Sequence, residues 1–293
     1  MTSWLILLDN DEKGSTSVRH ARYIERVLRS QPKEHSVQRL VWREGIVVPD
    51  ADIVIDIGSR CRIEEIGAKL KINYIEALPG YHTPLDDKRY DLYISGSPQL
   101  AQNDRWHYIP PPVDPAMFKA DEQHKTSLPE IDGVTYIGQY YGMKSYRKDM
   151  NRLQDFLQAA SAMYPVSVYG DNWQSARPPL RLMHRGYCDL IDLWSVYRHS
   201  IAINTTKGLD HSSTACNLRP METWASGGIL WSDPLPPEFD EWYVPLGEIN
   251  KESLCNEIME RMEPQREEFR RVVCERYNYR VFVDKLLRLT QEY

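Results

Sequence analysis

Short apolar runs alternate with amphipathic stretches along the first hundred residues. Residues 17–29 carry apolar side chains every three or four positions, which predicts a helix with one buried face. Residues 63–70 show a second helical pattern. The apolar runs short enough to be strands are residues 3–9, 36–42, 51–58, 72–78 and 90–97. Near-continuous apolar strands that alternate with helices are typical of a parallel sheet covered on both faces.

The same rhythm returns after a proline-rich segment. Residues 109–133 hold five prolines and many polar residues, which favours a linker. The later predicted strands are residues 134–138, 166–170, 201–206 and 227–233, and the later predicted helices are residues 148–163, 189–198, 219–226, 253–262 and 267–290. We therefore predict two α/β domains, with this division: residues 1–112, a linker at 113–133, a second domain at 134–265, and a closing helix at 266–293.

Charge and cysteine content narrow the function classes. The chain has 36 basic and 42 acidic residues and a net charge of −6, which disfavours a protein whose main affinity is for nucleic-acid phosphates. The five cysteines are widely spaced and form no CxxC pair, so we expect reduced thiols, a cytoplasmic location and no zinc site. The apolar run at 4–8 is too short for a signal peptide, and no stretch approaches the roughly 18 apolar residues of a membrane helix.

The clearest candidate for chemistry lies within residues 201–233. A strand ends there in a polar loop, and the helix that follows carries Asn217, Arg219 and Glu222 in its first turns. A helix N-terminus with an arginine suits a phosphate, and a carboxylate one turn further on can accept both hydroxyls of a ribose. The pattern therefore predicts a nucleotide site. The same residues would equally serve to cap and solvate the start of a helix.

This block resembles the donor-binding motif of GT-B glycosyltransferases, and most closely the CgeB-like (spore maturation protein-like) group. In that group N-x-R-x-x-E leads into a turn of small residues and a strand that ends in Asp. The matching residues are Asn217, Arg219, Glu222, Ala225, Gly227, Gly228 and Asp233. Further matches follow the family's order: Val113, Asp114 and Phe118 in the interdomain segment, Gly138 with Lys144, Arg147 and Lys148, and the V-Y-G-x-x-W stretch at 168–173 with the segment at 184–206.

The resemblance covers residues 109–240 and implies a fold and a division of labour. The fold would be an α/β GT-B fold, with two Rossmann-like domains whose parallel sheets face each other across a cleft. The N-terminal domain would bind the acceptor and the C-terminal domain the nucleotide-sugar donor. The helix at 266–293 would pack back toward the N-terminal domain.

Donor-binding roles can be carried over residue by residue. The resemblance implies that Glu222 holds the ribose and that Arg219, with the backbone of Asn217 and Leu218, lies at the diphosphate. Tyr187 would lie beside the base. Gly138 would let backbone N–H groups approach the phosphate or sugar closely. The other expected donor contacts are Gly14, Tyr140, Gly170, Asn204, Asp210 and His211.

Catalysis would use charged groups of the chain and no metal. By resemblance, Lys144 or Arg147 would supply the cation that stabilises the departing diphosphate. An inverting enzyme would also need a base that deprotonates the acceptor, and we expect His82 first, followed by His20 and Asp9.

A retaining enzyme would need no such base. Many retaining GT-B enzymes carry an acid eight positions before the ribose-binding glutamate, whereas Thr214 stands there in this chain. The loop that contains Asp210 and His211 would then hold the sugar hydroxyls. The stereochemistry and the donor sugar therefore stay open.

The sequence as a whole predicts transfer of a hexose from a nucleoside-diphosphate sugar, most simply UDP-glucose, to an acceptor hydroxyl. No metal, further cofactor or partner protein is expected. A small molecule, a glycan or a protein is favoured as acceptor over DNA because of the negative net charge. Three alternatives remain: a sugar-nucleotide epimerase, a phage-type glucosyltransferase that modifies a hydroxymethylated DNA base, and a non-catalytic sugar-nucleotide-binding protein of the same fold.

Overall fold

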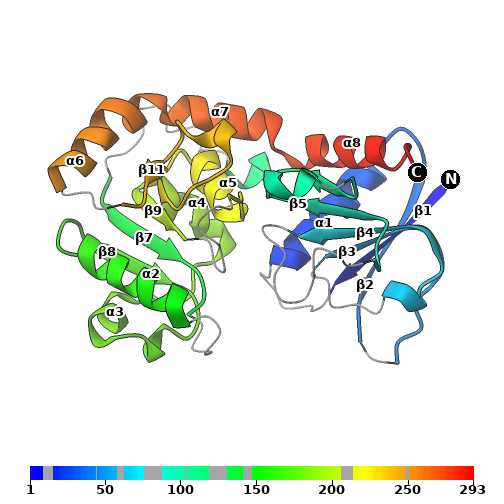
Figure 1. The fold of residues 1–293 in the computed structure, drawn as a ribbon, viewed down its shortest axis with the longest axis horizontal. Coiled ribbons are helices and arrows are strands. Elements are labelled where there is room, and N and C mark those ends of the chain that lie inside the picture. Colours follow the sequence, from blue (N-terminus) through cyan, green and yellow to red (C-terminus); the bar gives the residue numbers. More distant parts are fainter. Residues whose placement is uncertain are drawn as a thin grey trace. The chain divides into compact units, whose positions relative to one another are not determined.

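The structure is a computed structural model of the 293-residue chain. It forms two compact units, of which the first comprises residues 1–114, 215–218 and 276–293, and the second residues 115–214 and 219–275 (Figure 1). The first unit is thus assembled from three separate segments of the chain. The structure describes residues 1–8, 16–43, 45–57, 63–75, 88–102, 104–118, 131–140, 147–205, 214–247 and 251–293.

The first unit contains a sheet of six strands in the order β2-β1-β3-β4-β5-β6, and all neighbouring strands pair in parallel. The strands are β1 (Thr2–Leu8), β2 (His35–Val41), β3 (Ala51–Ile57), β4 (Ala68–Ile75), β5 (Leu92–Ser95) and β6 (Trp106–Tyr108). Helix α1 (Thr16–Arg29) connects β1 to β2, and short 3₁₀ turns occupy Ile63–Glu65 and Pro98–Gln102. β1 and β3 end in five consecutive buried residues, as expected for central strands covered on both faces.

Alternate strand residues point to opposite faces of this sheet, and each face has its own core. On one face Ile6, Ile55 and Ile72 pack with the apolar sides of α1 and α8 (Tyr279–Leu289). On the other face Leu7 and Val54 pack with residues that lie outside the α-helices; these are Ile63, Ile66, Tyr90, Tyr93 and Trp106. Helix α8 therefore completes the core of the N-terminal sheet from the far end of the sequence.

The prediction of a helix at residues 63–70 is wrong. Only Ile63–Glu65 forms a helical turn, and β4 already begins at Ala68, opposite Ala51 of β3. The apolar spacing fits a helix as well as it fits a turn followed by a strand, so pairing with β3 decides between them. Gly67 lies at the transition, where a Cβ atom would come within 2.6 Å of a carboxylate oxygen of Asp50.

The second unit contains a parallel sheet of five strands in the order β11-β10-β9-β7-β8. The strands are β7 (Gly133–Ile137), β8 (Val166–Tyr169), β9 (Ser200–Asn204), β10 (Ile229–Ser232) and β11 (Val244–Pro245). The helices of this unit are α2 (Arg147–Ala160), α3 (Pro178–Met183), α4 (Leu190–Arg198), α5 (Leu218–Ala225), α6 (Lys251–Asn256) and α7 (Arg266–Arg276). Short 3₁₀ turns add Pro115–Phe118, Trp173–Ser175, Pro237–Phe239 and Glu263–Gln265.

The strand order of this sheet reverses between β7 and β9. The chain runs from β7 through α2 to β8 on one side, and from β9 through α5 to β10 on the other. Because such crossovers are right-handed, α2 and α5 cover opposite faces of the sheet. The carboxyl ends of β7 and β9 therefore form a topological switch point, where open α/β sheets bind their ligands.

The closing helices differ from the expectation of two continuous stretches. The first consists of α6 and a π-helical segment at Glu257–Met262. The second is interrupted between α7 and α8, where the Asn278 side chain caps α8 by accepting the N–H of Val281 at 3.0 Å. Beside this cap, Val113 N–H donates to the Tyr277 carbonyl at 2.8 Å, and Tyr279 N–H donates to the Val113 carbonyl at 3.2 Å.

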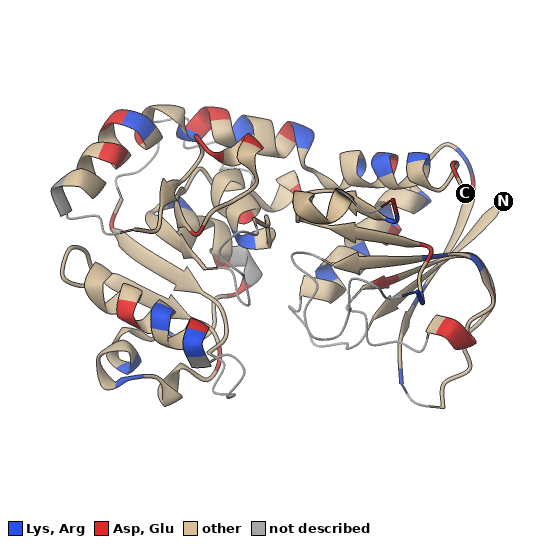
Figure 2. Cartoon of the chain, viewed as in Figure 1, with Lys and Arg blue, Asp and Glu red and all other residues tan. Residues whose placement is uncertain are grey.

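Charged residues of both signs lie along α7 (Figure 2). Arg271 pairs with Glu268 at 2.6 Å and with Glu275 at 2.8 Å. These partners are three and four positions away in the sequence, so they lie on the same face of the helix. No helix in the described part of the chain is both long and apolar enough to cross a membrane.

Candidate functional site

Arg219 fixes a positive charge at the switch point. It lies in the first turn of α5, where its Nε and Nη2 donate to the carbonyl of Ile137 at 3.1 and 2.8 Å. Its Nη1 donates to Oδ1 of Asn204 at 2.9 Å, and its guanidinium carbon lies 4.7 Å from the centre of the Tyr136 ring. The side chain thus reaches the last residue of β7 and the last residue of β9. These contacts leave the cation little freedom of orientation.

Gly138 and Gly170 bring the chain segments after β7 and β8 into close contact. Gly138 N–H donates to the Tyr169 carbonyl at 2.9 Å, and the Gly138 carbonyl accepts from Trp173 Nε1 at 2.7 Å. A Cβ atom at Gly138 would lie 3.0 Å from Nη2 of Arg219. At Gly170, which has φ +122°, a Cβ atom would lie 2.8 Å from the Gly138 carbonyl carbon. Only glycine allows this backbone approach.

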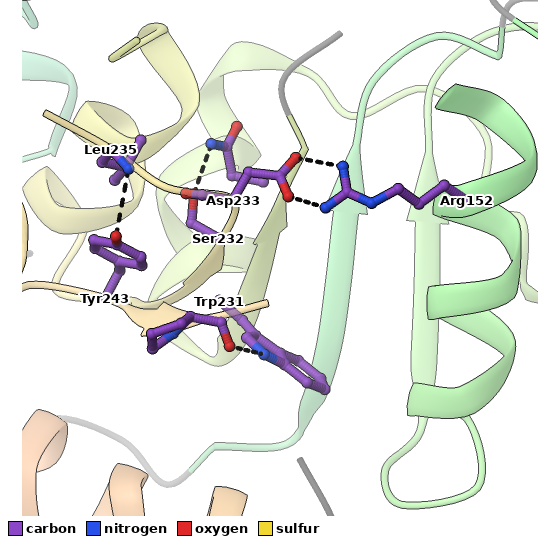
Figure 3. A network of polar contacts seen from close by, with 8 residues as sticks. Arg152, Trp231, Ser232, Asp233, Leu235 and Tyr243 are labelled. Carbon is purple, nitrogen blue, oxygen red and sulfur yellow. Dashed lines mark hydrogen bonds and ion pairs between the residues drawn. The ribbon is translucent and has the colours of Figure 1, made fainter. Parts of the chain in front are cut away.

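A polar network continues from Asn204 across the carboxyl ends of β9 and β10, and Figure 3 shows its part around Ser232, Asp233 and Arg152. Asn204 Nδ2 donates to the Ser232 hydroxyl at 2.9 Å, and the Asn204 carbonyl accepts from the N–H of Asp233 at 3.0 Å. The carboxylate of Asp233 accepts two hydrogen bonds from Arg152 of α2, one of them 3.1 Å long from Nη1 to Oδ2. Through Asn204 the network reaches Arg219, so it joins two guanidinium groups.

Glu222 places a buried negative charge one turn beyond Arg219. It lies on α5 with 5% of its surface exposed. Burial, together with the smaller effects of the charges of Asp192, Asp189 and Glu222, raises the pKa of the Cys188 thiol to about 11. Glu222 therefore acts electrostatically on the segment that also carries Tyr187, whose surface is 57% exposed.

The other expected donor residues that the structure describes are divided between the two units. Tyr140 belongs to the second unit, where its N–H donates to the Asp171 carbonyl at 3.0 Å and its ring centre lies 5.5 Å from that of Trp173. Asn217 and Leu218 group with the first unit, and so does Cys216, whose N–H donates to the Gly96 carbonyl at 2.8 Å.

His20 lies in the core of the first unit. It is 1% exposed, its Nδ1 is 2.8 Å from the hydroxyl of Tyr279, and its ring centre is 5.0 Å from that of Tyr74. Its suggested part as a base stays a prediction. Arg147 begins α2, and its side chain lies outside the described part of the structure, as do the residues Asp9, Gly14, His82, Lys144, Asp210 and His211.

Arg152 is a site residue that the sequence did not reveal. Its partner Asp233 is 81 positions away, and a basic residue on the polar side of a helix gives no signal of such a pairing. Trp173 was likewise expected only as part of a family motif, not as a donor to Gly138. Among the described residues, no cluster of three or more His, Cys, Asp or Glu side chains could hold a metal ion.

Comparison with solved structures defines the fold. It is similar to AviGT4, a glycosyltransferase involved in avilamycin A biosynthesis, with a TM-score of 0.65, 12% identity, and coverage of 98% of this chain and 96% of that one. It is similar to sucrose-phosphate synthase from Thermosynechococcus elongatus (TM-score 0.63, 11% identity, coverage 100% and 99%). The lipopolysaccharide outer core galactosyltransferase WaaB gives a TM-score of 0.56, 11% identity, and coverage of 99% and 100%. The chain has the GT-B fold, and the predicted fold class is confirmed.

Sequence comparison finds a family match over part of the chain. Residues 147–287 match the glycosyl transferase-like family, whereas no curated protein matches this chain. The chain therefore combines a GT-B fold with a glycosyl transferase-like match over residues 147–287, and both agree with glycosyltransferase as the expected class of enzyme. The CgeB-like subgroup stays a prediction.

Proposed function

We propose that this protein transfers a hexose from a nucleoside-diphosphate sugar to a hydroxyl group of an acceptor, without a metal ion. UDP-glucose is the first donor to test, and a small molecule, glycan or protein is the favoured acceptor. The donor binds at the carboxyl end of the second sheet. The described cysteines, Cys188, Cys216, Cys255 and Cys274, are free thiols, which supports a reducing compartment such as the cytoplasm as its location.

The relation of Arg219 to Glu222 carries this proposal. The two residues are three positions apart on α5 and so share one side of the helix. Arg219 is fixed at the switch point by Ile137 and Asn204, and Glu222 is buried and helps to raise the pKa of Cys188, the residue after Tyr187. A cation followed by a carboxylate matches the order of diphosphate and ribose in a nucleotide sugar.

The reaction moves one glycosyl group. The bond between the anomeric carbon and the diphosphate oxygen breaks, its electron pair stays on the diphosphate, and the acceptor oxygen forms the new bond to that carbon. Arg219, with Lys144 or Arg147, stabilises the charge that develops on the diphosphate. The acceptor proton passes to a base such as His82 if the configuration inverts, or to the departing phosphate if it is retained.

Substitution of Glu222 tests the donor site. A thermal-shift panel of UDP-, GDP-, ADP- and dTDP-sugars first selects the nucleotide, because a ligand that binds the folded state raises its melting temperature. We expect Glu222→Gln to weaken binding of that nucleotide about 10- to 100-fold, since it loses charge-assisted hydrogen bonds to the ribose. The melting temperature without ligand should stay nearly unchanged. Calorimetric titration measures the affinity.

The matched control is Glu260→Gln, which changes an exposed carboxylate in the π-helical segment Glu257–Met262. It should bind the nucleotide as the wild type does. Equal nucleotide affinity of the Glu222→Gln variant and the wild type would refute the ribose assignment.

Removal of divalent ions tests the metal-free mechanism. Because the cations that stabilise the leaving diphosphate are side chains, we expect the rate of sugar transfer to be the same with excess EDTA and with added Mg²⁺. Donor hydrolysis, followed by release of the nucleoside diphosphate, provides the readout before the acceptor is known. A large loss of rate with EDTA that Mg²⁺ restores would contradict this part of the proposal.

A further inference from the structure

Arg152 has no part in the function proposed so far, although it lies at the same end of the sheet as Arg219. Its guanidinium faces the carboxylate of Asp233 in a two-bonded pair (Figure 3). The two partners differ in exposure, because the side chain of Asp233 is 2% exposed and that of Arg152 is 50% exposed. The carboxylate is thus buried, and the arginine side chain that it holds is half exposed.

The pair lies beside the switch point. Asp233 directly follows β10, and its N–H donates to the carbonyl of Asn204 at 3.0 Å. The side chain of Asn204 accepts from Arg219 at 2.9 Å. Arg152 and Arg219 come from α2 and α5, on opposite faces of the sheet, and meet at this network. Two cations from opposite sides therefore converge on the carboxyl ends of β9 and β10.

A contribution to the stability of the fold does not by itself explain why Arg152 and Asp233 form this pair. A carboxylate loses its hydration when it is buried, and its attraction to a half-exposed arginine offsets that loss only in part. An apolar pair of similar size would commonly serve the fold as well. A two-bonded carboxylate does, however, fix the plane and position of a guanidinium, as a binding site for an anion requires.

We propose that Arg152 binds the diphosphate of the donor together with Arg219, and that Asp233 is the positioning residue that orients Arg152. The inference rests on the proposed function, since the anion is that of the nucleotide sugar. The diphosphate of such a donor carries two negative charges and gains a third when the sugar leaves. Two fixed guanidinium groups match the bound donor and interact more strongly as the third charge develops.

The test compares ligands with and without phosphates. Affinities for UDP and for uridine are measured by calorimetric titration on the wild type and on the double variant Arg152→Met/Asp233→Asn, which leaves no unpaired buried charge. We expect UDP to bind the double variant about 10- to 100-fold more weakly, with uridine affinity unchanged, because only the phosphate contacts are lost. The single variant Asp233→Asn should show a smaller loss of the same kind. Arg288→Met, on the exposed side of α8, is the control and should resemble the wild type.

The outcomes separate the two proposals. An unchanged ratio of UDP to uridine affinity in the double variant would overturn the role of Arg152 and leave the donor site standing. Equal losses for UDP and uridine would also overturn it, because they would mark a structural effect. If the double variant does not fold, Arg152→Lys decides by the same ratio, which should fall because lysine cannot replace the two-bonded geometry. If the wild type binds neither UDP nor the diphosphates of guanosine, adenosine and thymidine, both proposals fail.

Discussion

Replacement of Arg266 by methionine is expected to lower the free energy of unfolding by about 3–5 kcal/mol. Arg266 is 1% exposed, yet its guanidinium is fully engaged by the ends of other elements. Its Nε donates to the Gly227 carbonyl at 2.6 Å, its Nη2 to the Arg198 carbonyl at 2.7 Å, and its Nη1 pairs with Glu263 at 2.8 Å. Arg198 is the last residue of α4, and Gly227 lies two residues beyond the end of α5. In the variant, both carbonyl groups lose the hydrogen bond that the guanidinium donates.

Urea denaturation followed by tryptophan fluorescence measures this effect. Arg271→Met provides the control, because Arg271 lies on the same helix and pairs with Glu268 and Glu275, and all three side chains are more than half exposed. Its loss should leave stability nearly unchanged, since exposed ion pairs contribute little. A similar loss of unfolding free energy in both variants would show that the buried contacts of Arg266 stabilise the fold no more than the exposed ion pairs of Arg271.

Substitution of Gly170 by alanine should disrupt nucleotide binding and stability together. Its φ of +122° disfavours alanine, and the new methyl group would meet the Gly138 carbonyl, which is backbone and cannot rotate away. The chain segments after β7 and β8 must then separate, and Gly138 moves relative to Arg219. We expect about 2–4 kcal/mol of lost stability and at least a tenfold loss of nucleotide affinity.

Gly45→Ala separates the two causes of that loss. Gly45 also has a positive φ, of +80°, but a Cβ atom there meets nothing within 4 Å. It should cost about 1–2 kcal/mol from backbone strain alone and leave nucleotide affinity as it was. Retention of wild-type affinity by the Gly170→Ala variant would argue against a role of this loop contact in the donor site.

The spacing of apolar residues predicted the helices and strands in which only one period, helical or strand-like, fits the sequence. The helix expected at 17–29 is α1 (Thr16–Arg29), and the apolar run at 51–58 is β3 (Ala51–Ile57). The pattern failed where two periods fit the same residues, as at 63–70. It also missed β6 (Trp106–Tyr108) and α3 (Pro178–Met183), which are too short to complete a recognisable period. Pairing with distant strands and packing decide such segments.

The candidate site shows the same division. Asn217, Arg219 and Glu222 lie close together in the sequence, so a motif could indicate them. The pairing of Arg152 with Asp233, and the approach of Gly170 to Gly138, depend on strands that meet only in the folded sheet. A family resemblance indicated both glycines and implied that Gly138 lets backbone N–H groups approach the donor. It did not indicate that Gly170 approaches the Gly138 backbone or that Gly138 adjoins Arg219.

The placement of α8 has a consequence for synthesis of the chain. The core of the N-terminal sheet includes Tyr279, Phe282, Val283 and Leu286, each of which contributes roughly 1.5–3 kcal/mol by its burial. Domains generally fold in the order in which they emerge from the ribosome. Here the first sheet to be translated must wait for residues 276–293 before its core is closed. The second unit, translated later, is complete earlier, so the half of the protein that is made first is finished last.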